Sequence, residues 1–430
     1  MSELIAQAHD DAVADTIGWV EKHAAYTRRG AQGIAQVDST GFIAAAFTHR
    51  DSRAGDPDLR THVAVSNKVC TRDGNWLSLD GRALFENKVA ASERYNTRLE
   101  ALLTDRLGVR FADRDGGTLG KRAVREIVGF DGELLRVWSS RRADIEPALA
   151  ELRLQFQADH GRPPTAVEAQ KLAQQATLDT REGKHAPRSL NDQRATWRAE
   201  AITVVGDEQL DQTLRRILTP RRRPTDPLPS TDVVARSVLA TIQAERATWQ
   251  SNHVRAEAER QVRRYAAVPH FLMDQFVDDV VARVLSPAMS ISLTPHRETD
   301  EPAALRRLDG ASVYEIAGSH RYSSTAILDA EQRVLAHANR RDGRALDPST
   351  IALALLEGTA NGIHLGADQA AMVRDLAGSG ARVQLALAPA GTGWHRQDRH
   401  HAGPRPRLDS GRRQRHRPRT LCSRGTSIGR

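Results

Sequence analysis

Two histidines, His49 and His62, are the residues of this 430-residue chain whose type and spacing best suit metal chemistry. A neutral imidazole is a common ligand of borderline divalent metal ions. Residues 41–49 form a short apolar run and residues 60–69 alternate, so both segments predict β-strands. The turn formers of residues 50–59 predict an antiparallel hairpin with a long connection, which would bring the two imidazoles together. By spacing alone, two of 16 histidines are more often ordinary surface or core residues.

The amino acids around the two histidines favour a metal-binding role instead. FTHRDSRAGDPDLRTHVAVSNKV closely resembles the metal-binding hairpin of TrwC/TraI-type (MobF) conjugative relaxases, which nick one DNA strand through a tyrosine and carry it into a recipient cell. In that family three histidines hold a divalent cation, Mg, Mn or Zn, that polarises the scissile phosphate. The resemblance implies that His49 and His62 are the first and third ligands, while Arg60 takes the middle position. An always-protonated guanidinium repels a cation, so we expect the metal site to be weak or absent.

The resemblance covers roughly residues 1–200. It includes residues 23–30 (HAAYTRRG), 76–84 and 140–146 (SRRADIE), and the hairpin residues Ser52, Arg53, Asp56, Pro57, Leu59 and Thr61. It implies an α+β fold in which residues 1–218 form the distal part of a relaxase palm, an antiparallel sheet with helices. Single-stranded DNA is the implied partner, and Arg53 is the candidate DNA-binding residue.

We find no counterpart of the family's catalytic tyrosines in this chain. They belong to an N-terminal stretch that precedes the resembling segments, so this chain is expected to start after it. Tyr26 is a tempting nucleophile, but HAAYTR resembles a later family segment. Without that tyrosine there is no acceptor for the transesterification, so we expect no catalytic residue and an inactive fragment, truncated at both ends. Missing sheet strands would also leave an exposed edge.

Residues 346–393 resemble the start of a P-loop helicase domain. Gln369 would read adenine, a buried strand over residues 383–387 follows, and Gly391, Thr392 and Gly393 are the remnant of a phosphate loop. Such a loop needs Lys and Ser/Thr next, to hold the phosphates and Mg²⁺, but this chain has Trp394 and His395 there. ATP, a cofactor of the family, is therefore not expected to bind.

The net charge of +8 comes from the C-terminal residues. Residues 394–430 contain 11 Arg, no Lys and 2 Asp, a net of +9, which leaves −1 for residues 1–393. We interpret this tail as disordered and as out-of-frame translation, because reading one base later allows GTGKT. The alternative is an evolved basic arm that binds nucleic acid. The nucleotide sequence decides between them.

Residues 219–230 hold four prolines and predict a linker. Residues 231–345 predict a mainly helical connector, of which a winged-helix-like module is one form, with Val284, Leu285 and Phe271 in its core. Elsewhere the patterns predict helices over residues 9–25, 81–107, 131–160 and 366–379, a helix that starts at Pro163-Pro164, a helical segment that contains Trp197 and runs to about Leu218, and a short strand near residues 125–130.

Composition excludes other classes of protein. No apolar run reaches the roughly 18–20 residues of a membrane span, and no signal peptide is present, so a cytoplasmic location is expected. Cys70 and Cys422 are too few for a disulfide framework or a zinc finger. Two alternatives remain open: a non-catalytic single-stranded DNA-binding protein, and a metal-dependent nuclease with a reduced histidine site assisted by Asp51 or Asp56.

Overall fold

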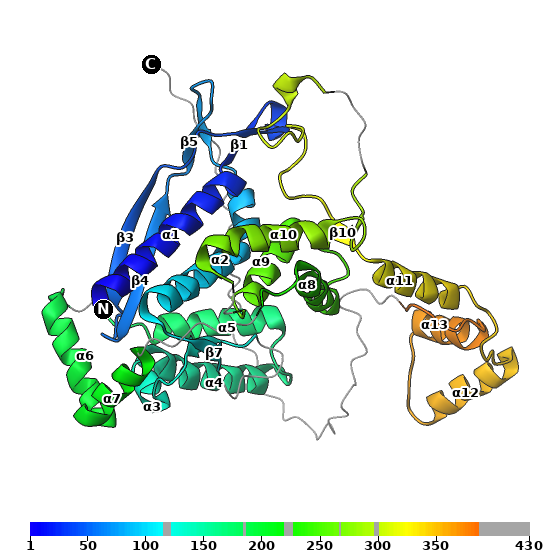
Figure 1. Ribbon diagram of the computed structural model, residues 1–430. Helices are drawn as coiled ribbons and strands as arrows, with labels where there is room; N and C mark the ends of the chain where they lie inside the picture. Colours follow the sequence, from blue (N-terminus) through cyan, green and yellow to red (C-terminus); the bar gives the residue numbers. More distant parts are fainter. Residues whose placement is uncertain (115–121, 184–185, 219–226, 266–267, 296–300, 387–430) are drawn as a thin grey trace, which may run out of the picture. The chain divides into compact units, whose positions relative to one another are not determined.

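The computed structural model describes residues 1–114, 122–183, 186–218, 227–265, 268–295 and 301–386. It divides into two compact units, Met1–Arg333 (unit 1) and Val334–Arg430 (unit 2). The predicted α+β class is confirmed in unit 1, which combines long helices with antiparallel strands (Figure 1). The predicted palm sheet is not continuous, because the strands of the described residues form five separate two-stranded pairs.

Helices α1 (Ser2–Ala24) and α2 (Gly81–Leu107) lie side by side in unit 1 (Figure 1). The limits of α2 match the prediction because both have strong local signals. The Asp80 side chain accepts a hydrogen bond from the backbone N–H of Arg82, and Gly108 ends the helix at a φ of 69°. Helix α1 begins seven residues before the predicted start, at Ser2 rather than residue 9.

Strands β3 (Ala44–Asp51) and β4 (Pro57–Val65) form the predicted hairpin. The long connection predicted over residues 50–59 is wrong, since pairing continues to Asp51 opposite Pro57 and only residues 52–56 turn. The turn formers shorten the connection because they satisfy its backbone groups. Ser52 N–H donates to the Asp56 carbonyl oxygen at 2.9 Å, and Asp56 N–H donates to Ser52 Oγ at 3.1 Å.

The other strand pairs are short. The strand predicted over residues 60–69 is divided between β4 and β5, and the strand predicted near residues 125–130 is confirmed as β8. The pairs are β1 (Tyr26–Arg29) with β2 (Ala35–Asp38), β5 (Lys68–Cys70) with β6 (Trp76–Ser78), β7 (Phe111–Asp113) with β8 (Arg125–Ile127), and β9 (Ile291–Ser292) with β10 (Tyr322–Ser323).

Five helices follow β8, and their boundaries correct three predictions. They are α3 (Gly132–Val137), α4 (Ser140–His160), α5 (Ala166–Asp179), α6 (Leu190–Val205) and α7 (Asp207–Leu218). The helical stretch 131–160 is thus interrupted, and Gly206 separates α6 from α7. Pro163 and Pro164 precede α5 and do not begin it, because Thr165 and Glu168 form a capping box that sets the first turn.

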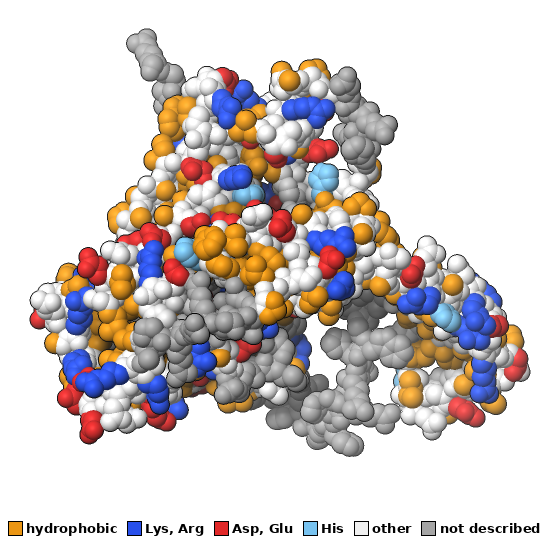
Figure 2. All heavy atoms as spheres, in the orientation of Figure 1, with side chains coloured by type: hydrophobic (Ala, Val, Ile, Leu, Met, Phe, Trp, Pro, Cys, Tyr) orange, Lys and Arg blue, Asp and Glu red, His pale blue; other side chains and the backbone are white. Residues whose placement is uncertain are grey.

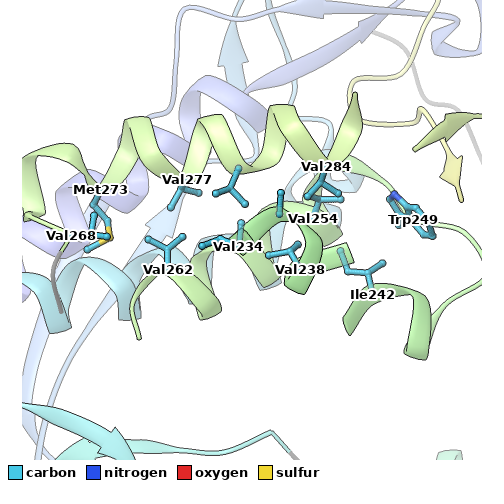
Figure 3. Packing of buried hydrophobic residues seen from close by; sticks show 13 residues of the cluster. Val234, Val238, Ile242, Trp249, Val254, Val262, Val268, Met273, Val277 and Val284 are labelled. Atoms are coloured by element: carbon cyan, nitrogen blue, oxygen red, sulfur yellow. The ribbon is translucent and has the colours of Figure 1, made fainter. Parts of the chain in front are cut away.

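Helices α8 (Thr231–Glu245), α9 (Ser251–Val262) and α10 (Met273–Leu285) surround the largest core cluster (Figure 3). Val284 is fully buried as predicted, and Leu285 packs against the cluster. Phe271 is 72% exposed, so its predicted core position is wrong. It lies in the 3₁₀ turn His270–Leu272, from which Met273 rather than Phe271 enters the core.

Unit 2 contains α12 (Pro348–Ala360) and the predicted helix α13 (Ala367–Gly378), while α11 (Thr325–Ala338) spans the boundary between the units. The buried strand predicted over residues 383–387 is wrong for residues 383–386, which form no strand and leave Leu385 83% exposed. A buried strand needs a paired neighbour, and the described residues of unit 2 contain none. The tail, residue 387 and Gly391, Thr392 and Gly393 lie outside the described residues.

Charged side chains are distributed over the surface of the described residues. Cationic and anionic side chains are interspersed on the visible face (Figure 2), as expected for a nearly neutral body. Within these residues, no helix combines the length and apolar character that a membrane crossing requires. The predicted domain limits at residues 218, 230 and 345 remain predictions.

Candidate functional site

The β3–β4 hairpin brings His49 and His62 together on one face. Phe47 pairs with His62 and His49 pairs with Arg60, so His49 and His62 are diagonal neighbours whose side chains share a face. Their ring centroids are 5.1 Å apart and the rings are nearly perpendicular, at 78°. Both side chains are exposed, so a ligand can reach them from solvent.

Arg60 lies directly opposite His49 on the same face. Its guanidinium donates to the carbonyl oxygen of Asp51 at 2.8 Å and forms an ion pair with Asp58. A positive charge therefore lies on the same face as the two imidazoles, held toward the hairpin tip. Among the described residues, no group of three or more His, Cys, Asp or Glu side chains could hold a metal ion. Two imidazoles beside a guanidinium do not fit the three-histidine metal site of the family.

The hairpin tip is held by residues that lie far along the sequence. Asp51 accepts hydrogen bonds from Gln193 at 2.7 Å and Arg188 at 3.3 Å, and both carboxylate oxygens of Asp56 accept from Ser140 Oγ. Trp197 Nε1 donates to the Gly55 carbonyl oxygen at 2.7 Å. Both tip carboxylates are thus engaged in fixing the turn rather than completing a metal site with the histidines.

The sequence alone did not assign these anchoring roles. Ser140 belongs to the SRRADIE segment that carried part of the resemblance, which was the one available signal for it. Gln193 and Trp197 had no local signal because their partners lie 142 residues away in the chain. Arg53, the predicted DNA-binding residue, lies at the same tip and donates from Nη1 to the carbonyl oxygen of Glu182 at 3.2 Å.

The opposite face of the hairpin is bound to α1 and α2 through a buried histidine. His9 Nε2 lies 2.8 Å from Thr61 Oγ1, and His9 Nδ1 lies 2.7 Å from the hydroxyl of Tyr95. Thr61 Oγ1 continues the network to Thr48 Oγ1 at 3.0 Å. Burial lowers the pKa of His9, which favours the neutral imidazole. The chain of hydrogen bonds therefore fixes the strands that carry His49 and His62.

Replacing Tyr95 by Phe should lower the free energy of unfolding by about 1–3 kcal/mol, because one nitrogen of the buried His9 loses its partner. Urea unfolding of the variant and the parent chain measures the effect. Tyr314→Phe is the matched control, because Tyr314 is exposed. Equal losses in both variants would contradict a role of the His9 network in stability.

Tyr26 is not placed as a surface nucleophile. Its ring is buried, the Arg307 guanidinium lies 5.6 Å from the ring centroid, and burial raises the pKa of its hydroxyl. Burial keeps the phenol protonated and away from a DNA backbone, and it outweighs the Arg307 guanidinium, which acts in the opposite direction.

Gln369 lies in the first turn of α13. Its side-chain oxygen accepts the backbone N–H of Gly366 at 2.9 Å, so its described role is to cap the helix. The other predicted nucleotide-binding residues, Gly391, Thr392 and Gly393, are outside the described residues, so no nucleotide site can be built from this set.

The hairpin that carries the two histidines is joined to α1 and α2 by the hydrogen bonds of His9. Residues 1–204 match the TrwC relaxase family model. This segment of the chain is thus similar to relaxase domains of the TrwC/TraI type. Among curated proteins, the multifunctional conjugation protein TraI of Escherichia coli is 29% identical over 191 residues, which span 42% of this chain and 9% of that protein.

Solved structures of TrwC are also similar to this chain. The metal-free conjugative relaxase TrwC in complex with OriT DNA is 25% identical with a TM-score of 0.38, covering 47% of this chain and 66% of that one. A copper-bound TrwC complex with OriT DNA is 26% identical with a TM-score of 0.39, covering 47% and 63%. The chain spans less than two thirds of the length of each of these relatives.

Proposed function

We propose that unit 1 binds single-stranded DNA as part of a conjugative relaxase, and that this chain alone neither nicks DNA nor hydrolyses ATP. The observation that carries the proposal is the exposed hairpin face, with His49 and His62 adjacent, inside the segment that matches the TrwC relaxase family. Arg53, at the rigidly anchored tip, is the residue that we expect to contact a DNA phosphate.

The inactivity follows from the residues present on the hairpin and from Tyr26. A divalent cation, Mg, Mn or Zn, would polarise the scissile phosphate in the family. Here Arg60 stands where a third imidazole would be needed, so metal binding is weak or absent. The buried Tyr26 does not offer an accessible hydroxyl for attack. We therefore infer a DNA-binding role without strand transfer.

A separate proposal concerns residues 346–430. Residues 346–393 are the remnant of a P-loop helicase domain in which Trp394 and His395 replace the Lys and Ser/Thr that ATP hydrolysis needs. The out-of-frame origin of residues 394–430 remains our explanation for this replacement, and reading the gene tests it. No observation favours the alternative of a reduced metal-dependent nuclease, because Asp51 and Asp56 are engaged with Gln193 and Ser140.

Removing residues 394–430 should weaken binding to an oligothymidylate and flatten its salt dependence, because the tail carries a net +9. Fluorescence anisotropy of residues 1–393 and 1–430 across a salt series measures both. Residual binding by residues 1–393 is expected from unit 1, and its absence would contradict the proposal. Equal affinities would exclude the tail as a binding element.

Arg53→Gln in the shorter chain should lower the salt slope by about one, as loss of a single phosphate contact does. Arg162→Gln is the matched control, since Arg162 is an exposed arginine that pairs with Glu168 away from the hairpin. A nicking assay with both chains should show no cleaved strand. Cleavage in the absence of another relaxase would overturn the inactivity.

A further inference from the structure

Unit 1 contains two adjoining cavities away from the histidine hairpin. They lie among α2, the β7–β8 pair and helices α8 and α9, and have volumes of about 520 and 290 Å³. They share four lining residues, Arg125, Arg263, Arg264 and Tyr265. None of the hairpin residues lines either cavity.

The larger cavity is lined by guanidinium groups held in an alternating ladder with carboxylates. Arg260 and Arg263 both pair with Glu93, at 2.7 and 2.6 Å, and Arg122 and Arg260 share Glu257, at 2.6 and 3.1 Å. The ladder continues through Arg125 with Glu100 at 2.8 Å and Arg264 with Asp113 at 2.9 Å. The inner arginines are thus neutralised and fixed in direction.

The arginines at the rim retain donors for a ligand. Arg264 is 52% exposed and uses one nitrogen for Asp113. A guanidinium has five N–H groups, so most of those of Arg264 remain available. Arg110, which lines the smaller cavity, is exposed and forms no ion pair within the described residues. Fixed guanidinium groups at a cavity mouth are the usual receptors of phosphate groups.

The smaller cavity has a different lining. Phe111, Val128, Val268 and Met273 give it apolar walls, and the ring of Tyr265 lies at the junction with the larger cavity. Aromatic and apolar walls suit a planar ring, because bases stack on aromatic side chains. The pair of cavities therefore offers a cationic compartment next to an apolar one.

Protein interiors are packed to nearly crystal density, and cavities of several hundred Å³ with convergent polar groups are typical of ligand sites. We propose that these cavities bind a nucleotide, with its phosphate at Arg264 and its base against Phe111 and Tyr265. The nucleotide is either free or part of a single strand, and the site is separate from the hairpin.

Isothermal titration calorimetry of the full chain with thymidine 5′-monophosphate, thymidine and a ten-residue oligothymidylate tests the site. The monophosphate should bind, and Arg264→Gln should weaken it about tenfold or more, because a charge-assisted hydrogen bond is lost. Ala112→Trp, on an exposed lining residue, should block the apolar compartment and abolish binding. Arg198→Gln, a half-exposed ion-paired arginine on α6, is the matched control and should have no effect.

Comparing the ligands distinguishes a free nucleotide from a nucleotide within a single strand. Comparable losses for monophosphate and oligothymidylate in the Arg264 variant support a site that accepts both, and a loss for the oligothymidylate alone supports a strand segment. Equal binding of thymidine and its monophosphate would overturn the phosphate assignment. If the Arg264, Ala112 and Arg198 variants all bind every ligand with the same affinity, the proposed site is overturned.

Discussion

Replacing Arg60 by His is expected to raise the affinity of the chain for Mn²⁺ or Zn²⁺ at least about a hundredfold. The change removes a fixed positive charge worth roughly 1 kcal/mol per unit of cation charge in water, and adds a third ligand. A histidine at position 60 would share the face of His62 on the same strand and lie opposite His49. Three imidazoles would then converge on the exposed side of the hairpin.

Arg60→Gln separates the two contributions, because it removes the charge without adding a ligand. We expect a small gain in metal affinity for this variant and a large one for Arg60→His, measured by calorimetry with each metal. Adding His62→Ala to Arg60→His should cancel most of the gain. A gain that survives the loss of His62 would place the metal elsewhere and refute the hairpin assignment.

Replacing Arg94 by Met should lower the free energy of unfolding by about 3–5 kcal/mol, the usual cost of breaking a buried ionic cluster. Arg94 of α2 is 7% exposed and binds Asp15 of α1 at 2.9 Å and Asp274 of α10 at 2.7 Å. It also lies 3.8 Å from Glu259 of α9, which is 2% exposed. The variant leaves that carboxylate buried without its nearest cation.

The same variant should make stability depend on pH. Burial raises the pKa of Glu259 above its ordinary value of 4.5, and Arg94 opposes that shift. Without Arg94 the folded-state pKa rises further. A raised carboxyl pKa gives stability that is present below 4.5 and is lost as the pH rises through the folded-state value. Arg94→Met should therefore lose more stability at neutral pH than in acid.

A second substitution tests this cause. In Arg94→Met with Glu259→Gln, no charge is left buried, so part of the stability should return and the extra pH dependence should vanish. Chemical unfolding at several pH values measures both. If the double variant is as unstable and as pH-dependent as Arg94→Met, Glu259 is not the group responsible. Arg198→Met, on an exposed ion pair, is the control and should change stability by less than about 1 kcal/mol.

Local signals in the sequence were enough for several parts of the fold. Asp80 and Gly108 mark the two ends of α2 because a cap and a left-handed glycine act within one turn. The alternation of residues 60–65 and the turn formers before them predict the hairpin, and hence the approach of His49 to His62. The sequence also predicts that Arg60 disfavours a cation between the histidines, because a guanidinium stays protonated whatever its surroundings.

Burial and partner choice were decided by the tertiary structure. Phe271 is as apolar as a core residue, yet it is 72% exposed, whereas the nearby Met273 is buried in the core cluster. The apolar residues 383–386 have the pattern of a strand but lack a described neighbour to pair with. The strand pattern is local, whereas the hydrogen-bonding partner that a strand requires is not.

The residues of the hairpin site also differ in whether the sequence or the tertiary structure determined their role. Sequence by itself determined which residues could form the hairpin face: His49, His62 and the intruding Arg60. Only the folded chain decided what holds that face in place, namely His9 behind Thr61 and the side chains of Ser140 and Gln193 at the tip. These contacts join residues 52 to 142 positions apart. Contacts over such separations depend on the packing of whole helices, which no local pattern specifies.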